Sequence, residues 1–81
     1  MNVWIINYHD GFSKMNYVTG VADSKETAQV LAQRHCDAVM HLPCTLLWTA
    51  NGQVGQVMYV DHPETVHGSL YGLEKFEVST E

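Results

Sequence analysis

Several side chains of types that bind metals lie close together in the middle of the sequence. His41 and Cys44 flank a Leu-Pro pair at a spacing that lets both reach one ion, and Cys36 precedes them on the chain. Imidazole nitrogen and thiolate sulfur are the usual ligands of tetrahedral zinc. One hypothesis is therefore a small zinc-binding domain that uses these three residues together with a later loop histidine, His62.

The same residues also fit a simpler interpretation. The chain has no paired Cys-x-x-Cys motif, and His35 and Cys36 are neighbours on a predicted helix, where adjacent side chains diverge by about 100°. Free cysteine is among the most buried residue types, and cytoplasmic thiols stay reduced. We therefore expect Cys36 and Cys44 to be buried free thiols, and we predict no bound cofactor.

Catalytic motifs are missing from the sequence. Neither cysteine is flanked by a nucleophile elbow, and no GxGxxG or GxxxxGK[ST] phosphate loop occurs. Asp61 and Glu64 form a carboxylate pair, but they fall in a predicted exposed loop, where solvated charge is the ordinary interpretation. We predict that the protein is not an enzyme. A dimeric small-ligand binder that stacks a nucleotide base on Trp4, Trp48 or Tyr59 is a second alternative, beside zinc.

Composition and charge limit the partners. The chain has 81 residues, of which 46% are hydrophobic and 16% are charged, which suits one folded domain over residues 1–81. Nine acidic residues against four basic ones give a net charge of −5. Four basic side chains are too few to bind nucleic-acid phosphates directly. An acidic surface favours a basic protein partner instead. No apolar run approaches the roughly 20 residues of a membrane span, and the start lacks the basic residues of a signal peptide, so we expect no membrane contact and a cytoplasmic location.

Hydrophobic periodicity predicts three elements in the first half of the chain. Residues 2–8 are apolar on both parities, which indicates a central strand that is covered on both faces, and residues 14–21 return as its hairpin partner. A helix follows, capped by Asp23 with Glu26 or by Ser24 with Thr27. It ends near residue 39, and its predicted buried stripe consists of Ala28, Leu31, Ala32, His35 and Val39.

The second half of the chain predicts three more strands. Residues 45–50 and 53–60 flank Asn51-Gly52, which favours a two-residue type I′ hairpin. A proline and two glycines then indicate a long loop over residues 61–72, before a last strand over 73–79. The predicted fold is α+β, β-β-α-β-β-β, with an antiparallel sheet of four to five strands and one helix packed on one face.

One helix cannot cover both faces of such a sheet. The large side chains of Trp4, Ile6, Tyr8, Trp48, Met58 and Tyr59 therefore cannot all lie beneath it, and some must be exposed or covered by another chain. Aromatic residues and methionine dominate protein interfaces, and acidic side chains suit their rims. We predict partner contacts at Tyr8, Asp10, Trp48, Tyr59, Asp61 and Glu64, with a homodimer as one way to cover the surplus.

The layout also carries a resemblance, in residues 3–24 (VWIINYHDGFSKMNYVTGVADS), 23–33 (DSKETAQVLAQ) and 71–81 (YGLEKFEVSTE). It resembles small proteins of bacteriophages and other mobile elements, among them strand-helix-hairpin anti-CRISPR inhibitors. Known members of that group bind Cas proteins without catalysis. The resemblance implies a non-enzymatic inhibitor in the host cytoplasm that binds and blocks a host protein or protein complex for defence or nucleic-acid handling.

Overall fold

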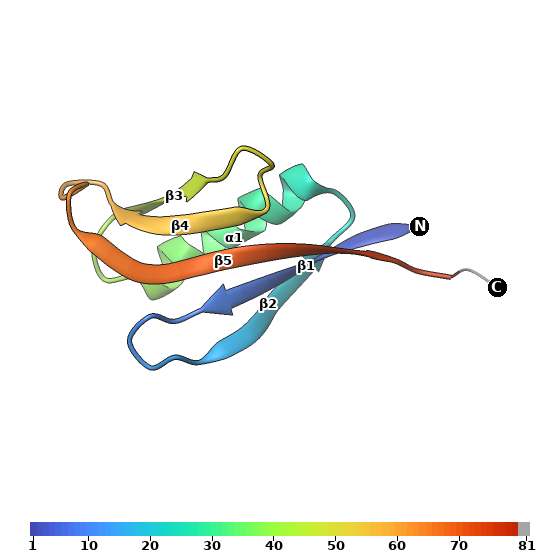
Figure 1. Ribbon diagram of the computed structural model, residues 1–81, viewed down its shortest axis with the longest axis horizontal. Coiled ribbons are helices and arrows are strands. Elements are labelled where there is room, and N and C mark those ends of the chain that lie inside the picture. Colours follow the sequence, from blue (N-terminus) through green and yellow to red (C-terminus); the bar gives the residue numbers. More distant parts are fainter. Residues whose placement is uncertain (80–81) are drawn as a thin grey trace.

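The protein folds into one five-stranded antiparallel sheet with a single helix lying across one face (Figure 1). The computed structural model describes residues 1–79, so the last two residues of the predicted 1–81 domain lie outside the described residues. The sheet order is β2-β1-β5-β4-β3. The predicted α+β class and β-β-α-β-β-β order are confirmed by β1 (Asn2–His9), β2 (Asn16–Ala22), α1 (Lys25–Val39), β3 (Cys44–Trp48), β4 (Val54–Tyr59) and β5 (Val66–Glu77).

The first and last strands pair at the centre of the sheet. β1 lies between β2 and β5 and is antiparallel to both, so the predicted internal strand is confirmed. The predicted cover on both of its faces is wrong, because the one described helix lies across a single face of the sheet. Pairing runs from His9 opposite Leu70 to Asn2 opposite Glu77, so the start of β1 and the end of β5 lie side by side (Figure 1). The other three strands flank this pair, with β2 on one side and β4 and β3 on the other.

The helix begins where the sequence predicts. Ser24 is its N-cap, and the Ser24 side chain accepts a hydrogen bond from the backbone N–H of Thr27 at 3.1 Å. Ala28, Ala32 and Cys36 are its buried residues, spaced by one turn each. The predicted stripe is wrong at Val39, which is 43% exposed, because the one-turn row through Cys36 faces the sheet instead.

The loop between β3 and β4 differs from the predicted two-residue turn. The N–H of Gly52 donates to the Thr49 carbonyl at 2.8 Å, and that of Thr49 donates to the Val54 carbonyl at 2.9 Å. Gly52 has a φ of +70°, whereas Asn51 does not adopt the positive φ that a type I′ turn requires. The side chains of Lys25 and Gln29 donate to the carbonyls of Asn51 and Gly52, so the start of α1 holds a longer loop in place.

The predicted loop over residues 61–72 is too long. β5 already begins at Val66, and Gly72 pairs with both Asn7 and Val54 inside the sheet. Of the two glycines that suggested a loop, Gly68 instead accommodates a close approach of backbone. A Cβ atom on Gly11 would collide with the carbonyl oxygen of Gly68, whose own φ is +89°.

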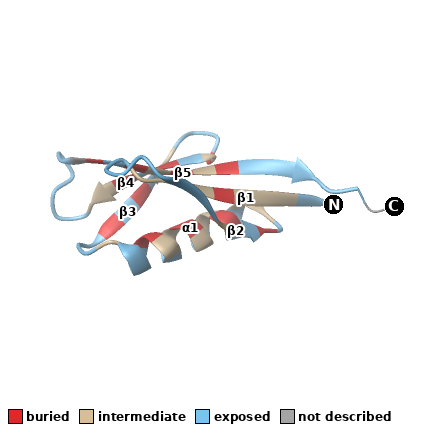
Figure 2. Cartoon of the chain, turned by 90° about the horizontal axis from the view of Figure 1, so that it is seen from below, coloured by how far each residue is buried: buried red, intermediate tan, exposed pale blue. Residues whose placement is uncertain are grey.

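The core lies between α1 and the sheet, and the second face of the sheet has no layer over it (Figure 2). Ile6, Val57 and Tyr71 are fully buried in one cluster that also contains the small residues of α1. Trp4, Trp48 and Tyr59 are partly buried and pack against the same core. The sequence predicts that the helix cannot cover all six large side chains. Of those six, only Met58 lies on the uncovered face, at a strand position opposite Thr45.

Candidate protein-binding surface

The uncovered side of the sheet, here called the open face, is lined by aliphatic side chains. Along β1, Ile6 and Tyr8 point to the core, so the alternate residues point away from it. Cross-strand pairing then places neighbours on the same face, with Val3 opposite Phe76 and Ile5 opposite Val21. The apolar residues of the open face are Val3, Ile5, Val18, Val21, Leu47, Val54, Met58, Leu70 and Phe76.

Many of these side chains are accessible to solvent. Leu47 is 59% exposed, Val21 is 55% exposed and Phe76 is 46% exposed. Glu74, opposite Ile5, is the one acidic side chain that the described strand residues place on this face. The apolar side chains come from all five strands, and polar residues such as Asn7 and Gln56 lie between them. Many exposed apolar side chains on one face of a sheet are typical of an interaction site.

The open face is also hollowed. One depression of about 470 Å³ is lined by residues of β3, β4 and β5, including Leu47, Val54 and Leu70. A second, of about 360 Å³, lies over Gly72 between Asn7 and Val54. Gly68 and Gly72 of β5 line these depressions, and neither has a side chain to fill them. A partner's side chains can therefore enter the face as well as lie on it.

The residues predicted to contact a partner lie in several places. Tyr8, Asp10 and Tyr59 line one cleft of about 370 Å³ on the helix side of the sheet. Tyr8 itself is only 6% exposed. The remaining three lie elsewhere: Trp48 packs against the core and borders an open-face hollow, Asp61 borders a shallow depression beside Tyr59, and Glu64 is exposed 4.0 Å from His62.

The aliphatic residues of the open face were missed by the sequence analysis. The available signal was parity: Val3, Ile5 and Val54 alternate with residues that the same strands bury. The predicted contacts were aromatic residues instead, and Trp48 and Tyr59 share the parity of buried Leu46 and Val57. These two rings therefore face the helix.

The four candidate zinc ligands are not brought together. Over residues 1–79, no group of three or more His, Cys, Asp or Glu side chains is arranged to hold a metal ion. Cys36 and Cys44 are buried free thiols, as expected, whereas His41 and His62 are exposed. Burial raises the pKa of Cys36 to about 11, which leaves a protonated thiol that is a poor ligand and a poor nucleophile at neutral pH.

His35 of α1 forms a hydrogen bond with a buried tyrosine of β5. Nδ1 of His35 and the hydroxyl of Tyr71 lie 2.5 Å apart in a hydrogen bond, and burial lowers the pKa of His35. The ring of Tyr8 packs against both, with its centroid 4.9 Å from that of Tyr71 and 5.3 Å from that of His35. The hydrogen bond satisfies the polar atoms that His35 and Tyr71 place beneath the helix.

Comparisons with known proteins give no family. No protein-family model matches the chain, and neither a curated protein nor a solved structure matches it significantly. Across residues 1–79, no helix has the length and apolar character needed to cross a bilayer.

Proposed function

We propose that the protein is a non-catalytic binding protein that occupies the surface of another protein with its open face. The observation that carries the proposal is the exposed aliphatic surface from Val21 in β2 to Leu47 in β3, which no element of the described chain covers. Burying such a surface stabilises a complex by roughly 25 cal/mol per Å² before the costs of association. The hollows over Gly72 and beside Leu70 add shape to the surface.

Charge argues for a different protein as the partner. The chain carries a net charge of −5, so two copies repel each other at long range, whereas a basic protein is attracted. The open face itself carries little charge beyond Glu74, and acidic residues at its margins would meet basic groups on the partner. A partner with an apolar patch and a basic rim fits both properties.

The resemblance to small bacteriophage proteins extends this proposal to a target class. We propose that the protein is an inhibitor of the anti-CRISPR kind, which blocks a host defence or nucleic-acid-handling complex. Such complexes present basic surfaces because they bind nucleic acid, and an acidic domain competes for those surfaces. The low number of cations on this chain supports binding to the protein rather than to the nucleic acid.

A matched pair of valines tests the binding surface. Val21 on the open face is 55% exposed and Val30 on the outer side of α1 is 51% exposed. Lysine is tolerated at both an edge strand and a helix surface, so Val21→Lys and Val30→Lys should both fold. We expect Val21→Lys to weaken capture of the partner by tenfold or more, about 1.4 kcal/mol, and Val30→Lys to leave capture unchanged.

Two outcomes would contradict the proposal. Equal capture by wild type and Val21→Lys would remove the open face from the interface. A concentration-dependent dimer of the protein alone, dissociated by Val21→Lys, would show that a second copy covers the face.

A further inference from the structure

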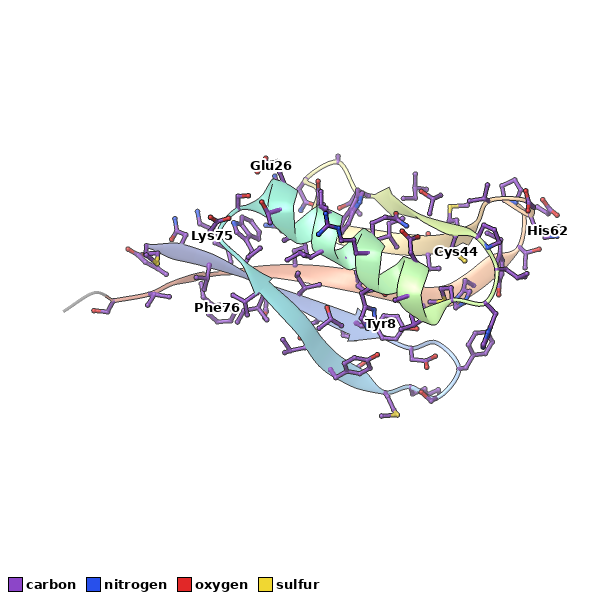
Figure 3. All side chains as sticks on the ribbon, turned by 180° about the vertical axis from the view of Figure 1, so that it is seen from behind. Tyr8, Glu26, Cys44, His62, Lys75 and Phe76 are labelled. Atoms are coloured by element: carbon purple, nitrogen blue, oxygen red, sulfur yellow. The ribbon has the colours of Figure 1, made fainter. Side chains whose placement is uncertain are left out.

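A second site lies on the helix side of the sheet, at the end remote from the chain termini. It is the 370 Å³ cleft introduced above, here called the end cleft, and Tyr8 lies in it beneath the C-terminal end of α1 (Figure 3). Its walls come from the β1–β2 turn, the segment after α1, and strands β4 and β5. The lining residues used below are Tyr8, Asp10, Phe12, Tyr59 and His67.

His67 supplies a buried polar atom without a protein partner. The residue is 9% exposed, and its Nδ1 is buried and makes no hydrogen bond to any described residue. A buried group of this kind is destabilising when it is left unsatisfied. The ring packs against Tyr59, at a centroid distance of 5.1 Å, and against Phe12, at 5.3 Å. Because this nitrogen has almost no accessible surface, an N–H donor in the end cleft reaches it only when the ring turns toward the cleft.

The charge in the end cleft is negative. Asp10 lines it, and a hydrogen bond from the backbone N–H of Phe12 to the carboxylate, at 2.9 Å, lowers the pKa of Asp10. Within residues 1–79, Asp10 makes no salt bridge. The C-terminal end of α1 also borders the cleft, carries partial negative charge, and has no basic residue in its last turn.

Aromatic rings complete the site. Tyr8, Phe12 and Tyr59 all line the end cleft, and Phe12 is 75% exposed although it serves no visible role in the core. The faces of aromatic rings attract cations, most strongly where water is excluded. The carboxylate, the helix terminus and the rings thus favour the same kind of ligand.

We propose that the end cleft binds an organic cation that carries N–H donors, a guanidinium or primary ammonium group. Asp10 pairs with its charge, and the rings of Phe12 and Tyr59 pack against it. His67 Nδ1 accepts one of its hydrogen bonds after the ring turns toward the cleft. The group comes either from a free amine or from an arginine or lysine of a peptide. This site lies on the opposite side of the sheet from the open face, so either site can exist without the other.

Titration with N-acetyl-arginine amide, followed by NMR at pH 8, tests the proposal. N-acetyl-citrulline amide is the matched neutral probe, because it keeps the shape and loses the charge. We expect saturable shifts at Phe12 and His67 with the arginine probe and binding at least about tenfold weaker with the citrulline probe. Equal affinity for the two probes, or no binding of either, would overturn the proposal.

Two charge variants give the control. In Asp10→Asn the side-chain oxygen still accepts the Phe12 N–H, so the turn is kept while the charge is removed. Glu74→Gln removes the same charge from the open face. We expect Asp10→Asn to weaken binding of the arginine probe by about tenfold and Glu74→Gln to have no effect. Equal effects of the two variants would show that the probe responds only to the net charge of the protein, and would overturn the site.

Two further arms use the aromatic wall and the source of the cation. Phe12→Leu keeps an apolar side chain at an exposed position and should weaken binding of the arginine probe a few-fold, whereas unchanged binding would remove the ring from the site. An arginine-containing peptide that binds much more tightly than the arginine probe would assign the cation to a protein segment. Equal affinity would assign it to a free amine.

Discussion

The two faces of the sheet are built from the same strands but have different contents. The helix side holds Ile6, Val57 and Tyr71, all fully buried, against alanines that let α1 approach closely. The open face holds aliphatic residues such as Val21 and Leu47 that are more than half exposed. Each strand supplies side chains to both faces. The two faces differ in exposure because α1 covers only one of them.

This comparison separates stability from recognition. A domain of this size has only one core, and here one helix provides all of its cover. Residues on the helix side are therefore expected to determine folding, while residues on the open face determine binding. Substitutions that break this division would break the account.

The largest expected effect comes from two adjacent isoleucines. Ile6 is fully buried on the helix side, whereas Ile5 is half-buried on the open face. We expect Ile6→Ala to lower the free energy of unfolding by about 2–5 kcal/mol, because it leaves a cavity in the core, and Ile5→Ala to lower it by about 1 kcal/mol or less. Urea unfolding of both variants measures the difference. Losses of equal size would show that the open face is part of the stabilising core.

A smaller effect should appear at alkaline pH. Burial raises the pKa of Cys36 from 9.0 to about 11, so the folded state holds the thiol proton more tightly than the unfolded state does. The contribution to stability is complete below pH 9 and is lost as the pH rises through 11, to a total of about 2–3 kcal/mol. Unfolding between pH 8 and pH 11 measures it, and Cys36→Ala should show a shallower decline. A wild-type profile as shallow as that of the variant would show that Cys36 is accessible to solvent.

The smallest expected effect on stability is at Gly72. A Cβ atom there would meet only His9 Nε2, at 3.9 Å, so Gly72→Ala should fit and should raise the free energy of unfolding by about 0.4–1 kcal/mol. The new methyl group would partly fill the hollow on the open face. We expect thermal unfolding to shift upward while partner capture falls. A variant that is more stable and binds equally well would place the interface away from this hollow.

Much of the fold could be predicted because its signals are local. Apolar residues on both parities of residues 2–8 identified a strand inside the sheet, and the two candidate caps, Asp23 and Ser24, placed the start of α1 to within one residue. The first part of β5 was missed because Gly68 and Gly72 are ordinarily loop residues. The place of Gly68 in a strand depends on the approach of Gly11 from a distant turn, which no local pattern encodes.

The candidate surface was harder to predict than the fold. The surplus of apolar side chains over one helix was visible in the sequence, but which residues formed it was not. Trp48 and Tyr59 were selected by residue type, whereas the side that each one faces depends on strand parity relative to the helix. Tyr8, Asp10 and Tyr59 do share a cleft, although no sequence pattern places His67 beside them.

Site-specific photo-crosslinking in the cells that express the protein tests the central claim most directly. A photoreactive residue at Leu47, 59% exposed on the open face, is compared with one at Val30, 51% exposed on α1. We expect position 47 to crosslink to one protein that is not a second copy of this chain, and position 30 not to crosslink to that protein. Crosslinks to it from position 30 alone, or equally from both positions, would contradict the account.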